Sequence, residues 1–285
     1  MRHIDHVVVA VRDLDGVAEL YRRLGFQVGP RNVHPWGTEN RLIQFGSSFI
    51  ELITLGSGAH LIPSHQPRRF SFGAFVRDYL QYREGIAMQV LSSTNAESDA
   101  DRFAEQGIGD FEPFSFERKA GRPDGSETQV AFSLAFANDP GAPKAGFFVC
   151  QQHFPEIFWN RSLQKHANLA TNISAVTLSA FNPEQHADFL ERFTGSDRQS
   201  MNNGLKFVLD GGRIELVPAA ESRKESIRTP LLTSFSVRVD KVDTLNRLLT
   251  MEQIPFTASG DGITLAPTLL HGVELRFETE TKKLP

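Results

Sequence analysis

Hydrophobic and polar positions along the chain recur in an order that predicts a strand, a helix, a glycine and then short strands. The first copy begins with IDHVVVAV at residues 4–11, an apolar run with strand composition. Asp13 is a candidate N-cap, and GVAELYRRLG places apolar residues at helical spacing up to Gly25. Short strands are expected at residues 26–28, 41–45 and 49–54.

The same order returns three more times, which predicts an α+β fold of four βαβββ modules. The later copies open at Ile86, Ile173 and Phe235. The interval from the opening strand to the glycine is 21 positions for Ile4 to Gly25, 21 for Ile86 to Gly107 and 22 for Ile173 to Gly195. Glycine- and proline-rich stretches predict linkers at 56–72, 154–171 and 218–231, and hairpin connections at 119–125 and 138–146.

Composition narrows the functional classes. The net charge is −4 over 285 residues, with both signs dispersed, which disfavours nucleic acid and anionic membranes as partners. No apolar run reaches the roughly 20 residues that cross a bilayer. The N-terminal residues lead straight into the first strand, and the single cysteine, Cys150, suits a reducing compartment, so a cytoplasmic protein is expected. The 23 phenylalanines predict an aromatic core or an aromatic-lined cavity.

One carboxylate among apolar neighbours is the first chemical candidate. Glu51 lies in FIEL, on the strand that follows the loop HPWGTEN. An unpaired buried carboxylate is costly, so Glu51 is expected to face a wet cavity, to pair with a cation such as Arg41, or to bind a metal.

Two segments of the chain resemble the vicinal oxygen chelate superfamily, and within it the glyoxalase-like domain proteins. The resemblance rests on IDHVVVAVRDLDGVAELYRRLGFQV, on HPWGTENRLIQFGSSFIEL and on FFVCQQHFPEIFWN. It implies two tandem halves in which modules pair into cupped mixed β-sheets. The implied arrangement is a half at 1–155 with the proposed site, a linker at 156–171, and a second half at 172–285 that serves as a scaffold or as a metal-free cup.

The resemblance also implies positions for metal ligands. His6 takes the opening-strand position of module one and Glu51 the closing-strand position, while Ala87 and Met88 leave module two without its opening ligand. Aligning Gly46 with Gly146 puts Gln151 opposite Glu51, and His153 would share its face. The expected set is therefore His6, Glu51 and His153 around Zn, Fe, Mn or Ni, with Glu51 also placed to act as a general base.

Each candidate also has a structural interpretation. His6 would be a hydrogen-bonded core histidine, and His153 would only cap the turn before Phe154. By strand alternation, Ile4, His6 and Val8 share one face and Asp5, Val7 and Val9 the other. At the rim, four residues would contact substrate together with Gln151, or would stabilise their own loop: His34, Trp36, Thr38 and Asn40.

Two functions from different classes remain. The first is a metal-dependent lyase, isomerase or dioxygenase that acts on a small oxygenated organic molecule. The second is a metal-free protein that binds or sequesters an aromatic ligand. Ala175 stands where His6 does in module one, and Glu215 echoes Glu51 without that partner, so the second half is expected to be structural. A homodimer is also compatible with the sequence.

Overall fold

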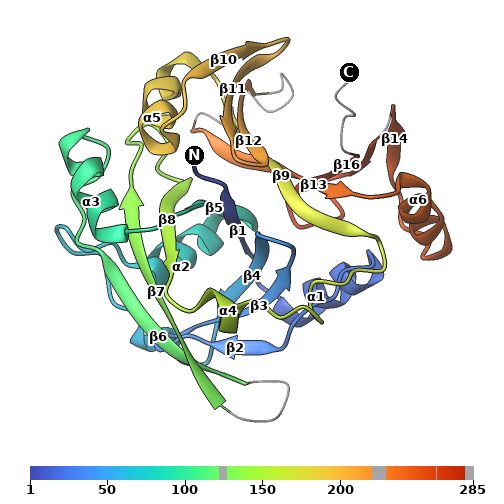
Figure 1. The fold of residues 1–285 in the computed structure, drawn as a ribbon, viewed down its shortest axis with the longest axis horizontal. Helices are drawn as coiled ribbons and strands as arrows, with labels where there is room; N and C mark the ends of the chain where they lie inside the picture. The colour runs from blue at the N-terminus through green and yellow to red at the C-terminus, as the bar shows by residue number, and fades with distance from the viewer. Residues whose placement is uncertain (122–126, 220–228, 261, 280–285) are drawn as a thin grey trace.

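The computed structural model describes residues 1–121, 127–219, 229–260 and 262–279. Two eight-stranded mixed sheets follow one another along the chain (Figure 1). This confirms the predicted α+β fold with two tandem halves. Neither hairpin connection 119–125 nor linker 218–231 lies wholly within the described residues.

The first sheet has the order β2-β3-β4-β1-β5-β8-β7-β6. Its strands are β1 (Ile4–Ala10), β2 (Arg31–Val33), β3 (Thr38–Gln44), β4 (Phe49–Leu55), β5 (Gly85–Ser92), β6 (Phe114–Gly121), β7 (Glu127–Ala137) and β8 (Gly146–Gln152). The central pair β1 and β5 is antiparallel, and each lies parallel to the last strand of its own module, β4 or β8. The two modules are thus joined edge to edge through their opening strands.

The second sheet repeats this arrangement, with the order β10-β11-β12-β9-β13-β16-β15-β14. Its strands are β9 (Ala170–Ala180), β10 (Arg198–Met201), β11 (Gly204–Leu209), β12 (Gly212–Pro218), β13 (Leu231–Val239), β14 (Thr257–Ser259), β15 (Gly262–Leu265) and β16 (Glu274–Glu278). Its central pair, β9 and β13, is again antiparallel. The expected repeat is therefore present in both halves.

Each module carries a helix between its first two strands: α1 (Leu14–Arg23), α3 (Ala96–Glu105), α5 (Glu184–Thr194) and α6 (Val242–Met251). The side chains of Asp13 and Asn95 accept hydrogen bonds from backbone N–H groups in the first turns of α1 and α3, which fixes where these helices begin. Gly195 ends α5 with a left-handed φ of 70°, a conformation that favours glycine. The predicted strand at residues 26–28 is absent, and β2 forms five residues later.

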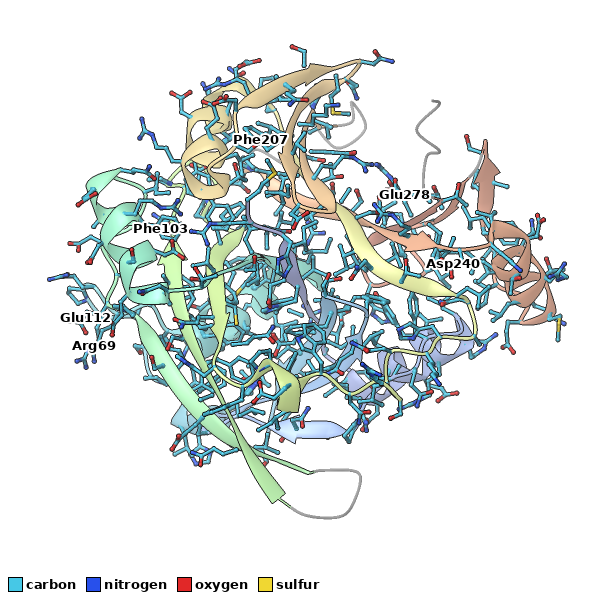
Figure 2. All side chains as sticks on the ribbon, viewed as in Figure 1. Arg69, Phe103, Glu112, Phe207, Asp240 and Glu278 are labelled. Atoms are coloured by element: carbon cyan, nitrogen blue, oxygen red, sulfur yellow. The ribbon has the colours of Figure 1, made fainter. Side chains whose placement is uncertain are left out.

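Two apolar cores divide the interior. One continues through both halves and holds Phe103 of α3 and Phe207 of β11 (Figure 2). The other lies within the first sheet's cup, against α2 (Phe72–Tyr82) and α4 (Pro155–Phe158). No helix in the described ranges is long and apolar enough to cross a membrane.

The connection between the halves is fixed to the first module. The imidazole of His166 accepts a hydrogen bond from the backbone N–H of Gln27 at Nδ1 and donates one to the carbonyl of Gln44 from Nε2. The side chain of Asn168 donates to the carbonyl of Leu24. These bonds anchor a segment that sequence alone described only as a linker.

Candidate functional site

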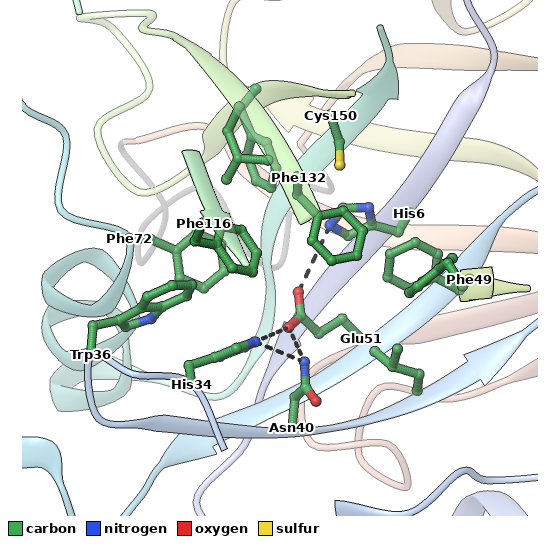
Figure 3. A pocket seen from close by; sticks show the side chains of 14 residues that line it. His6, His34, Trp36, Asn40, Phe49, Glu51, Phe72, Phe116, Phe132 and Cys150 are labelled. Carbon is green, nitrogen blue, oxygen red and sulfur yellow. Dashed lines mark hydrogen bonds and ion pairs between the residues drawn. The ribbon is translucent and has the colours of Figure 1, made fainter. Parts of the chain in front are cut away.

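A cavity of about 50 Å³ opens in the cup of the first sheet (Figure 3). Its walls are mostly aromatic and aliphatic, and its polar groups are two histidines, one carboxylate, one amide and one thiol. The lining residues are His6, His34, Trp36, Asn40, Leu42, Phe49, Glu51, Phe72, Phe116, Phe132, Leu134, Phe148, Cys150 and Phe158. A polar cluster in an otherwise apolar cavity is the usual form of a small-molecule site.

A bulge in β1 determines how His6 enters the cavity. The pairing of β1 with β5 shifts register between Ile4 and His6. Ile4 therefore packs in the core shared by both halves, while Val8 packs in the cup. The expectation that Ile4 shares a face with His6 and Val8 is wrong, because the bulge breaks the two-residue period at Asp5.

The same bulge brings Asp5 beside its neighbour. Oδ1 of Asp5 lies 2.5 Å from Nδ1 of His6, and the side chain of Gln152 donates to Oδ2 at 2.8 Å. Both Asp5 and His6 are buried. Phe49 stacks on the imidazole with ring centroids 4.2 Å apart. The ring of His6 is thus held from its edge and from one face, with Nε2 left toward Glu51.

Glu51 reaches the cavity from β4, opposite Val8 of β1. The amide nitrogen of Asn40 donates to Oε1 at 2.5 Å. His6 Nε2 lies 3.8 Å from Oε2, and His34 Nε2 lies 3.8 Å from Oε1. Figure 3 shows the carboxylate between the two imidazoles. The alternative pairing with Arg41 does not occur, because Arg41 binds Asp15 and the carbonyl of Gly29.

The loop before β3 holds His34 in place. Its Nδ1 lies 2.8 Å from Oγ1 of Thr38, and its ring stacks on Trp36 with centroids 4.6 Å apart. Gly37 has a φ of 95°, and a Cβ atom there would lie 2.2 Å from the carbonyl oxygen of Gly58. Only glycine fits this close approach. The loop therefore stabilises itself and also lines the cavity, while substrate contact by its residues stays a prediction.

Electrostatics keep the thiol in the cavity wall neutral. Burial raises the pKa of Cys150 well above its usual value, and the charges of Asp5 and Glu51 raise it further. A thiol is a nucleophile only as a thiolate. Cys150 therefore serves as an apolar group in the cavity wall.

The predicted residues divide into two groups. His6, His34, Trp36, Asn40 and Glu51 line the cavity, and Thr38 lies behind His34. Gln151 and His153 do not.

Gln151 lies on the face of β8 that points away from the cup, opposite to the predicted one. Its side chain accepts a hydrogen bond from the backbone N–H of Ala96 in α3, outside the cup, and its neighbour Gln152 contacts Asp5 instead. His153 is exposed, and its Nε2 lies 2.8 Å from Oγ of Ser133, the partner of Gln151 across β7 and β8. Gln152 thus shares the cup-facing side of β8 with Cys150, because a shift of one residue reverses the face of a strand.

The cavity does not bring together a three-ligand metal centre. In the part of the chain that the structure describes, no three His, Cys, Asp or Glu side chains gather as a metal site. His6 and His34 approach different oxygens of Glu51 rather than converging with it on one point. The expected set of His6, Glu51 and His153 is therefore wrong as a cluster, because His153 lies outside the cup.

The second half has different chemistry at matching positions. Glu215 of β12 pairs with Thr177 as Glu51 pairs with Val8, and Ala175 takes the place of His6. The guanidinium of Arg213 donates to Glu215 at 2.7 Å and to Glu278 at 3.0 and 3.1 Å. The carboxylate of Glu215 is thus satisfied by a cation, which is what the carboxylate of Glu51 lacks.

Comparison with known protein families identifies a family for most of the chain. The family model described as glyoxalase-like domain matches residues 4–194. No curated protein matches the sequence.

Solved structures share the fold at low sequence identity. A hypothetical protein from Staphylococcus aureus has a TM-score of 0.72 at 13% identity, over 98% of this chain and 100% of that chain. A mutant of 4-hydroxymandelate synthase from Streptomyces coelicolor has a TM-score of 0.62 at 10% identity, over 97% and 92%. A fusion of a xylose isomerase-like TIM barrel with 4-hydroxyphenylpyruvate dioxygenase has a TM-score of 0.55 at 12% identity, over 99% of this chain and 50% of that chain.

Proposed function

The chain belongs to the glyoxalase-like domain family of the vicinal oxygen chelate superfamily, and we propose that its first cup binds a small oxygenated organic molecule and moves a proton on it. A single observation carries this proposal: the gap of 3.8 Å between Nε2 of His6 and Oε2 of Glu51. That separation is too long for a direct hydrogen bond and short enough for both groups to contact neighbouring atoms of one ligand.

Each of the two side chains that flank the gap is held in place by a hydrogen bond at its other polar atom. Asp5 holds Nδ1 of His6, and Asn40 occupies Oε1 of Glu51, so Nε2 and Oε2 remain for the ligand. Positioned groups of this kind suit general acid–base catalysis, since little rearrangement precedes the reaction. The aromatic walls exclude water and strengthen each polar contact.

In the proposed reaction, a hydroxyl group of the ligand lies in the gap and donates a hydrogen bond to the lone pair on Nε2 of His6. The carboxylate of Glu51 then takes a proton from the adjacent carbon or hydroxyl, which leaves the negative charge on the ligand. Protonated Glu51 exchanges this proton with solvent and returns one to the ligand, so the charges are restored. Asn40 keeps the carboxylate oriented through its bond to Oε1. This assignment retains the general-base role predicted for Glu51 and replaces His153 by Asp5 and Asn40 as the supporting groups.

Proton exchange tests the proposal. The protein is incubated in D2O with hydroxyacetone, pyruvate and catechol, and loss of ligand proton signals is followed by NMR. We expect enhanced exchange with at least one compound, and loss of the enhancement in Glu51→Gln. Glu215→Gln is the matched control, because it changes the corresponding carboxylate of the second sheet. Equal exchange in both variants would reject Glu51 as the base.

Metal-dependent chemistry of the lyase, isomerase or dioxygenase type is the second candidate. What supports it is that Nδ1 of both histidines is engaged, by Asp5 and Thr38, while both Nε2 atoms face one carboxylate. Metal-bound imidazoles are commonly oriented through their second nitrogen in this way. What opposes it is that the amide nitrogen of Asn40 lies 3.2 Å from Nε2 of His34, and that the two imidazoles and the carboxylate do not converge on one point.

Metal analysis of protein purified without chelators separates the two candidates. A stoichiometric transition metal that is lost in both His6→Ala and Glu51→Ala would favour the metal-dependent candidate. The same low metal content in all three proteins would favour the acid–base candidate.

A further inference from the structure

A second cavity adjoins the first and is much larger. Its volume is about 410 Å³, and it lies between the segment 63–73 and the start of β6. Its lining is mixed, with hydroxyl, amide and charged side chains beside aromatic rings: Trp36, Pro63, Ser64, Gln66, Arg69, Phe70, Ser71, Phe72, Gly73, Glu112, Pro113, Phe114 and Ser115. We call it the outer chamber and the first cavity the inner chamber.

Only Trp36 and Phe72 appear in the walls of both chambers, among the residues that the structure describes. Their rings meet edge to face, with centroids 5.9 Å apart. Figure 3 shows the two side chains together on one side of the inner chamber, across from His6 and Phe49. They are the partition between the chambers.

The inner chamber is too small for an aromatic ring unless one of its walls moves. A cavity of about 150 Å³ is what holds a benzene ring in a protein core. The inner chamber offers about 50 Å³, so a ring enters it only if a wall side chain moves. Moving the partition joins the small chamber to a space of about 410 Å³.

Trp36 is the more exposed side of the partition. Phe72 is buried in the first turn of α2, whereas Trp36 is partly exposed on a loop. The indole Nε1 is buried without a hydrogen-bond partner in the described part of the chain, so rotation of the ring breaks aromatic contacts but no hydrogen bond. A Cβ atom at Gly73 would lie 3.0 Å from Cδ1 of Trp36, so the glycine makes room for the indole.

Resting on the function proposed above, we propose that Trp36 is a gate between the chambers, and that the ligand is a ring bearing oxygen groups with a polar chain. The ring occupies the inner chamber against His6 and Glu51. The chain passes Trp36 into the outer chamber, where hydroxyl and amide groups of Ser64 and Gln66 receive it. Arg69 and Glu112, paired at 3.0 Å, also line this chamber and lie at the edge of the molecule (Figure 2).

The stacking of Trp36 on His34 extends the role of the gate. His34 lies 3.8 Å from Glu51, so rotation of the indole removes the ring that supports His34. Trp36 is therefore also a positioning residue for the polar cluster. A gated site of this kind binds slowly relative to an open one.

Stopped-flow fluorescence with catechol and 4-(3-hydroxypropyl)catechol tests the gate. Trp159 is the reporter in every variant, because its ring lies 6.0 Å from Phe49 in the wall of the inner chamber. We expect Trp36→Leu to raise the association rate of catechol at least tenfold and Trp36→Phe to raise it less. Phe181→Leu, at an exposed residue that lines neither chamber, should change the rate less than twofold.

The longer probe tests the outer chamber. In the wild-type protein it should bind about tenfold more tightly than catechol, since its chain adds buried apolar area and a hydrogen bond. Equal affinities, or equal association rates in the wild type and Trp36→Leu, would overturn the gate while leaving the proposed function intact. Failure of catechol to bind any of these proteins would overturn both for this ligand class.

Discussion

Asp5 and His6 are sequence neighbours whose side chains meet on one side of a strand, with Oδ1 of Asp5 2.5 Å from Nδ1 of His6. In a regular strand they would point to opposite faces. The bulge between Ile4 and His6 permits the contact. The carboxylate selects the imidazole tautomer with its proton on Nδ1, which leaves the lone pair of Nε2 toward the cavity.

The first prediction concerns that tautomer. Nitrogen-15 NMR of the wild-type protein should show His6 with Nδ1 protonated and Nε2 unprotonated when the ring is neutral. In Asp5→Ala the acceptor is absent, so the ring should return to the commoner tautomer with its proton on Nε2. A wild-type spectrum with Nε2 protonated would contradict the assigned role of Asp5.

The second prediction concerns Asn40. Its amide donates to Glu51 and accepts from Asn32 at 2.9 Å, and both contacts are buried or partly buried. Asn40→Ala should lower the free energy of unfolding by about 1–3 kcal/mol, because it leaves a buried carboxylate oxygen without its donor. Urea denaturation measures this. Thr264→Ala, on a partly exposed position of β15, is the control and should cost less than about 1 kcal/mol. Equal losses would argue against the Asn40 bond.

The third prediction is a pH dependence. Burial lowers the pKa of His166, against a smaller raising effect from its bond to the Gln44 carbonyl. Between that lowered pKa and the usual 6.5, the unfolded chain binds a proton that the folded protein does not. Stability should therefore fall as pH falls below about 6.5, and this contribution should level off below the folded pKa.

His166→Gln isolates this contribution. The stability difference between wild type and variant should narrow as pH falls from 7.5 to 5.5, measured by urea unfolding. His60→Gln, at an exposed position, should leave the slope unchanged. A difference that is constant with pH would contradict the assignment.

The fourth prediction concerns Cys150. Because burial and the nearby carboxylates raise its pKa, the thiol should react with Ellman's reagent at least 100-fold more slowly in the folded protein than in urea at pH 8. Complete reaction within minutes in the folded protein would show that the wall of the cavity opens readily.

Much of the fold could be predicted, because periodicity records it directly. The strand–helix–glycine order located four modules and placed Glu51 in a closing strand. Helix α2 is not among the predicted elements, although Ser71 caps it and Phe72, Val76 and Leu80 follow at helical spacing. Because the segment before it is rich in glycine and proline, the sequence predicts a linker up to residue 72. This prediction leaves out one wall of the cavity.

The site itself was only partly predictable. His6 and Glu51 were identified from their strands, but the bulge at Asp5 has no signature in the apolar pattern. Gln151 and Gln152 differ by one position, and only the register of β8 against β5 and β7 decides which of them faces the cup. The aromatic walls contributed by Phe116 and Phe132 depend on pairing between β6 and β7, which sequence alone does not align.

The measurement that bears most directly on the proposed function compares ligand affinity in Glu51→Gln and Glu215→Gln by isothermal titration calorimetry. The ligand is whichever of hydroxyacetone, pyruvate and catechol binds the wild type most tightly. A hydrogen bond to a charged group contributes about 1.5–3 kcal/mol, so Glu51→Gln should weaken binding roughly 10- to 150-fold, and Glu215→Gln should leave it within twofold. Equal affinities in the two variants, or a loss confined to Glu215→Gln, would contradict a ligand site at His6 and Glu51.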